Sequence, residues 1–147
     1  MLQQYQLQPQ QLELEITERV LLADNQHVRQ VLSTLLELGV RLSLDDFGTG
    51  YSSLSYLSRF ALHTLKIDRA FVQRMSENQR SADLVKAIVA MGQSLQLQLV
   101  AEGVETMQQA ATLAELGCDY LQGYYFSRPQ TAAQITTQLA AQANAAG

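Results

Sequence analysis

An α/β fold with a mostly parallel sheet is the architecture that this sequence predicts, and three observations support it. Strand-like and helix-like segments alternate along the 147 residues, with short connections between them. Hydrophobic residues make up 47% of the chain and charged residues 16%, a balance typical of one folded domain with a large core. Because Cys118 is the sole cysteine, packing rather than disulfide bonds must hold the fold.

The first half of the chain predicts three strands and two helices. Apolar and polar residues alternate over residues 12–17, which favours a short strand. Apolar residues recur at helical spacing over residues 25–39, and this segment ends on a glycine. A second strand over 40–46, a short helix over 52–60 and a third strand over 63–68 follow. The residues expected to face the core from the helix at 25–39 are Val28, Val31, Leu32, Leu35 and Leu36.

The second half predicts two strands and three helices. A clear amphipathic helix covers residues 81–95, and a fourth strand lies within residues 97–105. A helix over 106–117, a fifth strand over 118–124 and a last helix over 131–142 complete the pattern. The core-facing residues expected from the helix at 81–95 are Leu84, Ile88, Met91 and Leu95.

Two of these helices begin with the same Thr-x-x-Gln pattern, at Thr106 and Gln109 and at Thr131 and Gln134. In such a capping box each side chain satisfies the backbone amide of the other residue. The two boxes therefore predict where both helices start.

Five β–α units in series imply a parallel sheet with helices packed outside it. A complete (β/α)8 barrel typically takes ~250 residues and at least about 200. The pattern alone therefore leaves two architectures open, an open doubly wound sheet or the larger part of a barrel. The glutamine-rich residues 1–11 are expected to form a connecting segment, and residues 12–147 the domain.

Charge and hydropathy patterning argue against several classes of protein. The formal net charge of −4 argues against a nucleic-acid-binding surface. Apolar runs stop well before the ~18 residues that a membrane span needs, and the first residues lack the pattern of a signal peptide. We therefore expect a cytoplasmic protein, or the cytoplasmic part of a membrane-anchored one, with no nucleic-acid or membrane contact from this segment.

Acidic residues lie at the ends of several predicted strands. Glu15 lies near the end of the first strand, Asp45 and Asp46 at the end of the second, and Glu102 at the end of the fourth. Lys66 lies near the end of the third. The carboxyl ends of parallel strands converge on one face of the molecule, where ligands bind. These carboxylates would crowd together there with a single obvious cation.

A divalent metal is the simplest compensation for such a cluster, which cannot stay ionised and unpaired in a partly dry cleft. Carboxylate oxygens suit magnesium or manganese, and adjacent aspartates can flank two ions about 3.5–4 Å apart, an arrangement that cleaves phosphate esters. Each residue also has a structural interpretation. Glu15 is then a solvated edge residue, Lys66 a cation that reaches solvent, and Glu102 with Glu105 the acids of a helix N-terminus. Their joint placement favours the metal site.

Two nearby patterns do not fit their usual functions. Asp46-Phe47-Gly48 matches the metal-binding triplet of protein kinases, but the chain has none of the companion kinase motifs. The run from residue 48 to 53 is close to a dinucleotide fingerprint, but a serine replaces its last glycine and two aspartates precede it. We expect Gly48 and Gly50 instead to let a loop fold tightly over the acidic site.

Five motifs carry a resemblance to a known family. In order they are LELEITE, LDDFGTGYSSLSYL, LKIDRAFV, VAEGVET and LGCDYLQGYYFSRP. They are similar to the successive motifs of the EAL domain family, bacterial phosphodiesterases that act on cyclic di-GMP. The resemblance implies an incomplete TIM-type (β/α) barrel, of which this chain would form about five C-terminal β–α units. It also implies two divalent ions, Mg2+ or Mn2+, and in-line attack of activated water on one phosphodiester to give linear pGpG.

Carried over residue by residue, the resemblance assigns the acidic residues to the two metals. It implies that Glu15 binds the first metal, that Asp45 bridges both, and that Asp46 and Glu102 bind the second. Lys66 resembles the residue that orients or deprotonates the attacking water.

The remaining assignments concern the substrate and the supporting residues. Gln122 resembles a residue that positions water and contacts the substrate together with Asp68. Glu18 resembles the acid that braces the glycine loop, and Glu105 a support behind the metal site. The full set of expected site residues is Glu15, Glu18, Asp45, Asp46, Gly48, Gly50, Lys66, Asp68, Glu102, Glu105 and Gln122, with Lys66, Glu102 and Gln122 as the catalytic members.

The sequence also departs from the family pattern. It contains no Glu-Ala-Leu motif, which in the family precedes LELEITE, so we expect the isolated chain to be weakly active or inactive. Open sheet edges predict self-association, such as a homodimer, and sensory or GGDEF-type domains are expected upstream in the parent protein. Two alternatives stay open, a non-catalytic cyclic di-GMP receptor or interaction module, and another metal-dependent barrel enzyme that abstracts a proton with Lys66.

Overall fold

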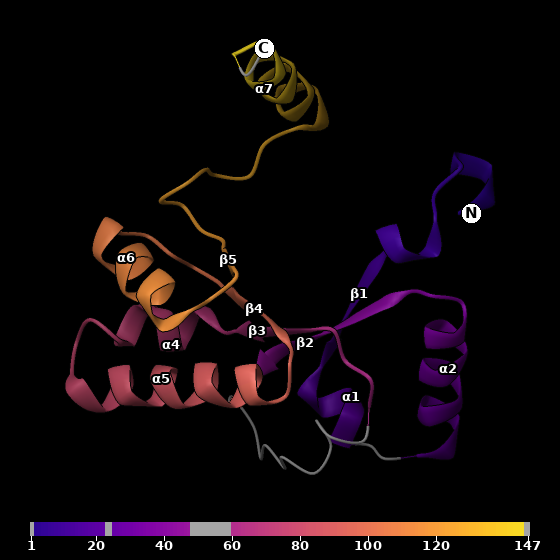
Figure 1. Ribbon diagram of the computed structural model, residues 1–147, viewed down its shortest axis with the longest axis horizontal. Helices are drawn as coiled ribbons and strands as arrows, with labels where there is room; N and C mark the ends of the chain where they lie inside the picture. The colour runs from indigo at the N-terminus through magenta and orange to yellow at the C-terminus, as the bar shows by residue number, and fades with distance from the viewer. Residues whose placement is uncertain (1, 23–24, 48–59, 146–147) are drawn as a thin grey trace.

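The centre of the molecule is a parallel five-stranded sheet (Figure 1). The computed structural model describes residues 2–22, 25–47 and 60–145. Its strands are β1 (Glu13–Thr17), β2 (Arg41–Phe47), β3 (Thr64–Ile67), β4 (Gln98–Ala101) and β5 (Tyr120–Leu121). They lie in the sheet in sequence order, and each neighbouring pair is parallel. This order confirms the barrel alternative, because a doubly wound sheet reverses its strand order at a switch point and the described strands do not.

Helices connect the strands where the sequence predicts them. The described helices are α1 (Glu18–Leu22), α2 (Gln26–Glu37), α4 (Arg69–Arg74), α5 (Gln79–Ser94), α6 (Met107–Leu116) and α7 (Ala132–Ala145), with 3-10 turns at Gln3–Tyr5 and Pro9–Gln11. The short helices α1 and α4 are not predicted from the sequence. The helix expected over residues 52–60 lies, apart from Phe60, outside the described residues. None of the described helices is long and apolar enough to cross a membrane.

Side-chain caps and left-handed glycines set the helix boundaries. Asn25 accepts the amide of Val28 at 2.8 Å, and Asn78 accepts the amide of Ser81 at 2.9 Å. The cap at Asn78 starts α5 two residues before the predicted start at residue 81. α6 ends on Gly117, whose φ of 91° is the left-handed conformation that only glycine adopts at little cost.

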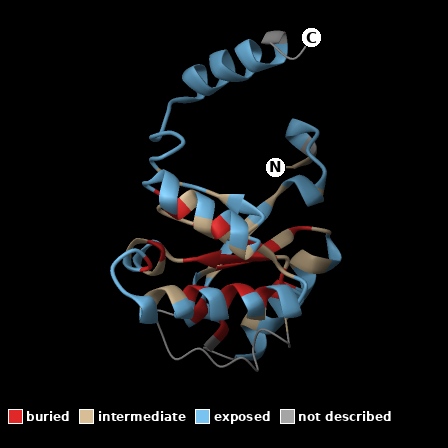
Figure 2. Cartoon of the chain, turned by 60° about the vertical axis from the view of Figure 1, so that its left-hand side comes forward, coloured by how far each residue is buried: buried red, intermediate tan, exposed pale blue. Residues whose placement is uncertain are grey.

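One face of the sheet is apolar and covered by helices. Figure 2 shows the buried residues gathered in the sheet and on the helix faces turned toward it. Leu42, Leu65 and Leu99 come from three neighbouring strands and are fully buried. α5 packs closely on this face, because a Cβ atom on Gly92 would lie 2.4 Å from Leu99 Cδ2. The hydrophobic core therefore lies between the sheet and its outer helices.

The buried helix faces differ in part from the predicted ones. Leu84 of α5 and Leu95, the C-cap of α5, are 46% and 37% exposed, so their predicted core positions are wrong. The buried residues of α5 are Val85, Ile88, Val89 and Gly92, so the prediction is confirmed for Ile88. α5 carries apolar residues on adjacent stripes, and the stripe that includes the glycine can approach the sheet most closely. Val31 of α2 is also 44% exposed, which corrects its predicted position.

The opposite face of the sheet is polar. Residues paired in register lie on the same face, and Glu13 pairs with Arg41, Ser43 with Thr64, and Thr64 with Gln98. The guanidinium group of Arg41 donates to Glu13 Oε2 at 3.0 Å and to Gln98 Oε1 at 2.5 Å. This polar face runs from the N-terminal ends of the strands to the C-terminal ends, where the acidic residues lie.

Two features lie outside the helix-covered core. Helix α7 stands apart from the sheet in Figure 1, and its described side chains are all exposed. Among them are Ile135 and Leu139, at 42% and 59% exposed. Strand β5 is shorter than the predicted segment 118–124, and it forms one edge of the described sheet, with β1 as the other.

Candidate active site

A β-bulge places Asp45 and Asp46 at the end of β2. The register of β2 against β3 shifts between Leu44 and Phe47, so that both aspartates stand opposite one residue, Lys66. Asp46 has a left-handed φ of 56°, and its amide donates to Asp45 Oδ1 at 3.0 Å. In a regular strand, adjacent side chains would point to opposite faces, whereas a bulge re-aims them next to a site. A left-handed non-glycine residue costs about 1 kcal/mol or more, a cost that is concentrated at functional sites.

Lys66 lies at the centre of the acidic cluster. Its Nζ is 2.6 Å from Glu15 Oε1, 2.6 Å from Glu102 Oε1 and 3.6 Å from Asp45 Oδ1. The side chain of Lys66 is only 9% exposed, while that of Glu15 is 56% exposed and those of Asp45 and Glu102 are in between. The structure thus brings four predicted site residues together at the C-terminal ends of the strands.

The ammonium group of Lys66 stays charged despite its burial. Desolvation alone would lower the pKa of Lys66. The hydrogen bonds with Glu102 and Glu15 and the negative charges of Glu102 and Asp45 outweigh this effect, so the pKa is raised above its ordinary value. With three carboxylates around one cation, the cluster has more negative than positive charge.

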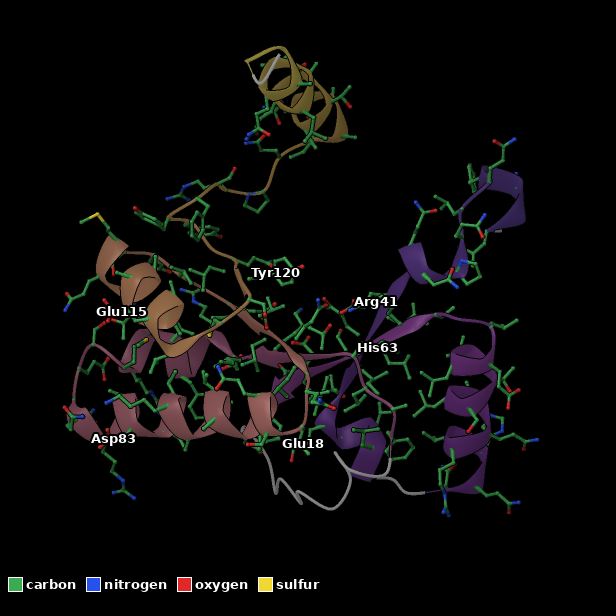
Figure 3. All side chains as sticks on the ribbon, in the orientation of Figure 1. Glu18, Arg41, His63, Asp83, Glu115 and Tyr120 are labelled. Carbon is green, nitrogen blue, oxygen red and sulfur yellow. The ribbon has the colours of Figure 1, made fainter. Side chains whose placement is uncertain are left out.

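Glu18 begins α1 directly after β1 and lies at this end of the sheet (Figure 3). It is 8% exposed, and neither of its carboxylate oxygens has a hydrogen-bond partner among the described residues. The hydroxyl group of Ser43 is buried without a partner in the same described part of the chain. A buried carboxylate needs a partner, because its desolvation is costly. The loop of Gly48 and Gly50, which the resemblance pairs with Glu18, lies outside the described residues.

The turn after β4 fixes the backbone beside Glu102. Gly103 has a left-handed φ of 68°, and a Cβ atom there would lie 2.3 Å from Arg69 Cγ. Arg69 Nη2 is 3.2 Å from Glu105 Oε1, and Gln73 Nε2 donates to the same oxygen at 3.0 Å. Helix α4, which follows β3, is therefore fastened to the turn that follows β4.

A cavity of about 180 Å³ lies beside the cluster. Its lining residues are Arg69, Glu102, Gly103, Glu105, Gln122, Gly123 and Tyr124. Gln122 reaches it because Gly123 packs on the backbone of Val104, whose oxygen would lie 2.1 Å from a Cβ atom on Gly123. Asp68 does not line the cavity, and its carboxylate caps α4 by accepting a first-turn amide at 2.8 Å.

The donor set suits a hard divalent ion in its chemistry but is not arranged around one. Carboxylate oxygens are the ligands that magnesium and manganese prefer. Within the described parts of the chain, no three His, Cys, Asp or Glu side chains are arranged as ligands of one metal ion. Glu15, Asp45 and Glu102 converge on the Lys66 ammonium group instead. A metal ion would take over part of these contacts.

Three residues that support the site are not predicted from the sequence as parts of it. Arg69 and Gln73 lie on the short helix α4, which the pattern of longer elements conceals. The sequence does contain one sign of α4, namely Asp68, because an aspartate commonly caps a helix N-terminus. Gln109 is predicted only as a helix cap, although its side chain also contacts the turn after β4.

Comparison with known proteins decides the family. The family model for the EAL domain matches residues 1–129. The chain belongs to the EAL domain family. Cyclic di-GMP phosphodiesterase NbdA of Pseudomonas aeruginosa is 53% identical over 118 residues, which are 80% of this chain and 15% of NbdA. The chain spans only 15–20% of the length of the curated relatives that it matches.

Solved EAL structures share the fold. The MucR phosphodiesterase of Pseudomonas aeruginosa, in complex with cyclic di-GMP, matches with a TM-score of 0.86 and 46% identity over 91% of this chain and 54% of that chain. BlrP1 of Klebsiella pneumoniae, solved with manganese and cyclic di-GMP, matches with a TM-score of 0.80 and 36% identity over 87% of this chain and 33% of that chain. The predicted barrel class is therefore confirmed, and this EAL chain covers about half of the MucR structure.

Proposed function

We propose that this chain is the C-terminal part of an EAL domain that hydrolyses cyclic di-GMP to linear pGpG with divalent metal ions. The observation that carries the proposal is the buried Lys66 ammonium group among Glu15, Asp45 and Glu102, at the C-terminal ends of parallel strands. The names of NbdA and MucR as phosphodiesterases support it. Because the chain spans part of its relatives, we expect it to be weakly active or inactive alone.

Four carboxylates would hold the metal ions. Glu15, Asp46 and Glu102 would each bind one ion, and Asp45 would lie between the two. Two bound divalent ions supply an activated water and neutralise charge on the phosphodiester. The oxygen donors favour magnesium or manganese, and BlrP1 has been solved with manganese and with calcium.

Lys66 would orient or deprotonate the attacking water. Burial alone would lower its pKa, but the contacts with Glu102 and Glu15 hold the pKa above its ordinary value. The amine therefore keeps its proton at neutral pH while these carboxylates contact it. Metal ions bound by Glu15, Asp45 and Glu102 would take over part of these contacts, and the amine would then lose part of what holds its proton.

The other site residues would support the reaction from both sides. Gln122 lines the same cavity as Glu102 and would position the water. Asp68 would contact the substrate with the carboxylate oxygen that does not cap α4. Glu105 would support the turn, and Glu18 would brace the glycine loop. The buried carboxylate of Glu18 supports this role, because it has no partner among the described residues.

Calorimetric titration of the chain with cyclic di-GMP, with and without manganese, tests the proposal while chromatography follows pGpG. Asp45→Asn removes a metal ligand with little change of shape, and Glu13→Gln removes a carboxylate at the far end of the same face. Metal-dependent binding that Asp45→Asn abolishes and Glu13→Gln retains supports the site, and conversion shows an active enzyme. Binding without conversion supports the receptor alternative. Binding that Asp45→Asn leaves unchanged contradicts the proposed site.

Self-association and further domains belong to the same proposal. β1 and β5 are the edges of the described sheet, and unpaired edges favour association with a second copy. Sedimentation velocity would show a concentration-dependent dimer, whereas a monomer at all concentrations would exclude it. MucR is named as a bifunctional diguanylate cyclase and phosphodiesterase, which supports a GGDEF-type or sensory domain in a cytoplasmic parent protein.

A further inference from the structure

The turn between β4 and α6 carries two acidic residues of the candidate site, and neighbouring elements hold its backbone. The amide of Glu102 donates to the carbonyl oxygen of Ile67 at 3.1 Å. The amide of Val104 donates to the carbonyl oxygen of Gln122 at 3.0 Å. The first part of the turn is thus tied to β3 and to the segment after β5.

Gln109 holds the second part of the turn through its side-chain amide. Its Oε1 accepts the backbone amides of Glu105 at 2.9 Å and Thr106 at 3.1 Å. Its Nε2 donates to the carbonyl oxygen of Val72, on α4, at 3.4 Å. Gln109 is 6% exposed, so water can hardly replace these partners. One buried amide therefore joins the turn to α4.

We propose that Gln109 is a positioning residue of the active site. By fastening the turn to α4, it keeps Glu102 against Lys66 and Glu105 against Arg69. α4 follows the strand that carries Lys66, so this amide connects the turn that carries Glu102 to the helix directly after that strand. Gln109 would touch neither substrate nor metal and would act through the turn. The role of Gln109 in catalysis rests on the proposed function, whereas its effect on the Lys66–Glu102 ion pair does not.

Helix α7 provides a matched control. The amide of Thr131 donates to Gln134 Oε1 at 2.8 Å, and the amide of Gln134 donates to Thr131 Oγ1 at 3.4 Å. This capping box has the same pattern as the one at Thr106 and Gln109. Gln134 is exposed on a helix that stands apart from the sheet (Figure 1). The same substitution at either glutamine removes a helix cap, but only the one at Gln109 releases the turn.

The test combines NMR on the whole chain, without metal, with three variants. Gln109→Met keeps the side-chain length and removes both polar groups, Gln109→Glu keeps the acceptor, and Gln134→Met is the control. We expect the amides of Glu105 and Thr106 to exchange on the order of tenfold faster in Gln109→Met, measured against a core amide such as that of Leu65. We expect most of the protection to remain in Gln109→Glu and all of it in Gln134→Met.

Two further measurements separate positioning from a purely structural role. The Lys66 ammonium resonance reports its contact with Glu102, and we expect it to shift in Gln109→Met but not in Gln134→Met. We also expect manganese affinity to fall on the order of tenfold in Gln109→Met alone.

Unchanged amide protection or an unchanged Lys66 resonance in Gln109→Met would overturn the positioning role. If the wild-type chain binds manganese, an equal manganese affinity in Gln109→Met would overturn it as well. If both NMR changes occur while the wild-type chain binds neither manganese nor cyclic di-GMP, the positioning role stands and the proposed function fails for this chain.

Discussion

Two charged clusters lie at opposite ends of the same polar sheet face. At the N-terminal ends of the strands, Arg41 pairs with one carboxylate, that of Glu13, and with the amide of Gln98. At the C-terminal ends, Lys66 faces three carboxylates. Figure 3 shows Arg41 near one end of the sheet and Glu18 near the other. Charge is balanced in the first cluster and unbalanced in the second.

The difference supports the proposal that a ligand binds at the C-terminal ends of the strands. Arg41 and Glu13 are about one-third exposed, so their pair is largely solvated and contributes little to stability. Lys66 is 9% exposed, and Asp45 and Glu102 are 23% and 22% exposed, so the negative charge of these two carboxylates is screened less by water than that of Glu13. A balanced cluster satisfies itself, whereas an unbalanced one gains from a bound cation. The C-terminal ends of barrel strands are also where active sites lie.

The largest expected difference between the two clusters is in the free energy of unfolding after the central cation of each is removed. Lys66→Met leaves three carboxylates without a counter-charge, so we expect the free energy of unfolding to fall by about 3 kcal/mol. Arg41→Met should lower it by less than about 1 kcal/mol, because its pair is solvated. Urea unfolding at pH 7 with a chelator present measures both. Equal losses in the two variants would remove the distinction between the clusters.

A glycine near each end of the sheet allows a second comparison. A Cβ atom on Gly123 would lie within 2.1–2.7 Å of Val104 backbone atoms, which cannot move aside, so Gly123→Ala should cost about 2–3 kcal/mol. Gly39 has a φ of 88°, and its Cβ atom would meet the flexible Gln10 side chain at 3.0 Å. Gly39→Ala should therefore cost about 1 kcal/mol. Thermal unfolding compares the two, and a larger loss at Gly39 would contradict the predicted close packing at Gly123.

The acidic cluster at the C-terminal ends of the strands could be predicted from the sequence, because its charged residues interrupt apolar strands. Glu15, Asp45, Lys66 and Glu102 each stand near a strand end, and strand order alone then brings them together. The bulge could not be predicted, since residue spacing along β2 does not give its register against β3. The same limit applies to Gln109, because its capping pattern does not predict the contact of its side chain with Val72 of α4.

The packing of α5 shows a second limit. Leu84 and Leu95 fit a helical stripe as well as Val85 and Val89 do, so periodicity alone cannot choose between them. The closest contact with the sheet decides, and it is made by Gly92, which has no side chain to place in a hydrophobic pattern. The fold class is thus more predictable than the rotation of a helix within it, because the class depends on the order of elements and the rotation on packing.

The raised pKa of Lys66 predicts a loss of stability at high pH. Above the ordinary lysine pKa of about 10.4, the unfolded chain loses this proton while the folded chain keeps it. The stabilisation is therefore complete below that pH and is lost as the pH rises through the folded pKa, by about 1 kcal/mol between pH 10 and pH 11. Unfolding of Cys118→Ala with and without Lys66→Met isolates the effect. If the free energies of unfolding of the two variants fall in parallel with rising pH, the predicted contribution of Lys66 is wrong.

Cys118 gives the contrasting case of a partly buried ionisable group without an opposite charge. Burial, and to a lesser extent the charge of Asp119, raises the pKa of its thiol to about 11, so the neutral form is favoured where Lys66 keeps its charge. The thiolate fraction at pH 8 should then be about a hundredfold below that of a free cysteine. We expect iodoacetamide to alkylate the folded chain more slowly by a similar factor, and the urea-unfolded chain at the free-thiol rate. Equal rates would show that the thiol is solvated, and burial would then not distinguish it from an exposed group. A slow folded rate would show a thiol that burial keeps neutral, in contrast to Lys66, which is more deeply buried and keeps its charge because carboxylates surround it.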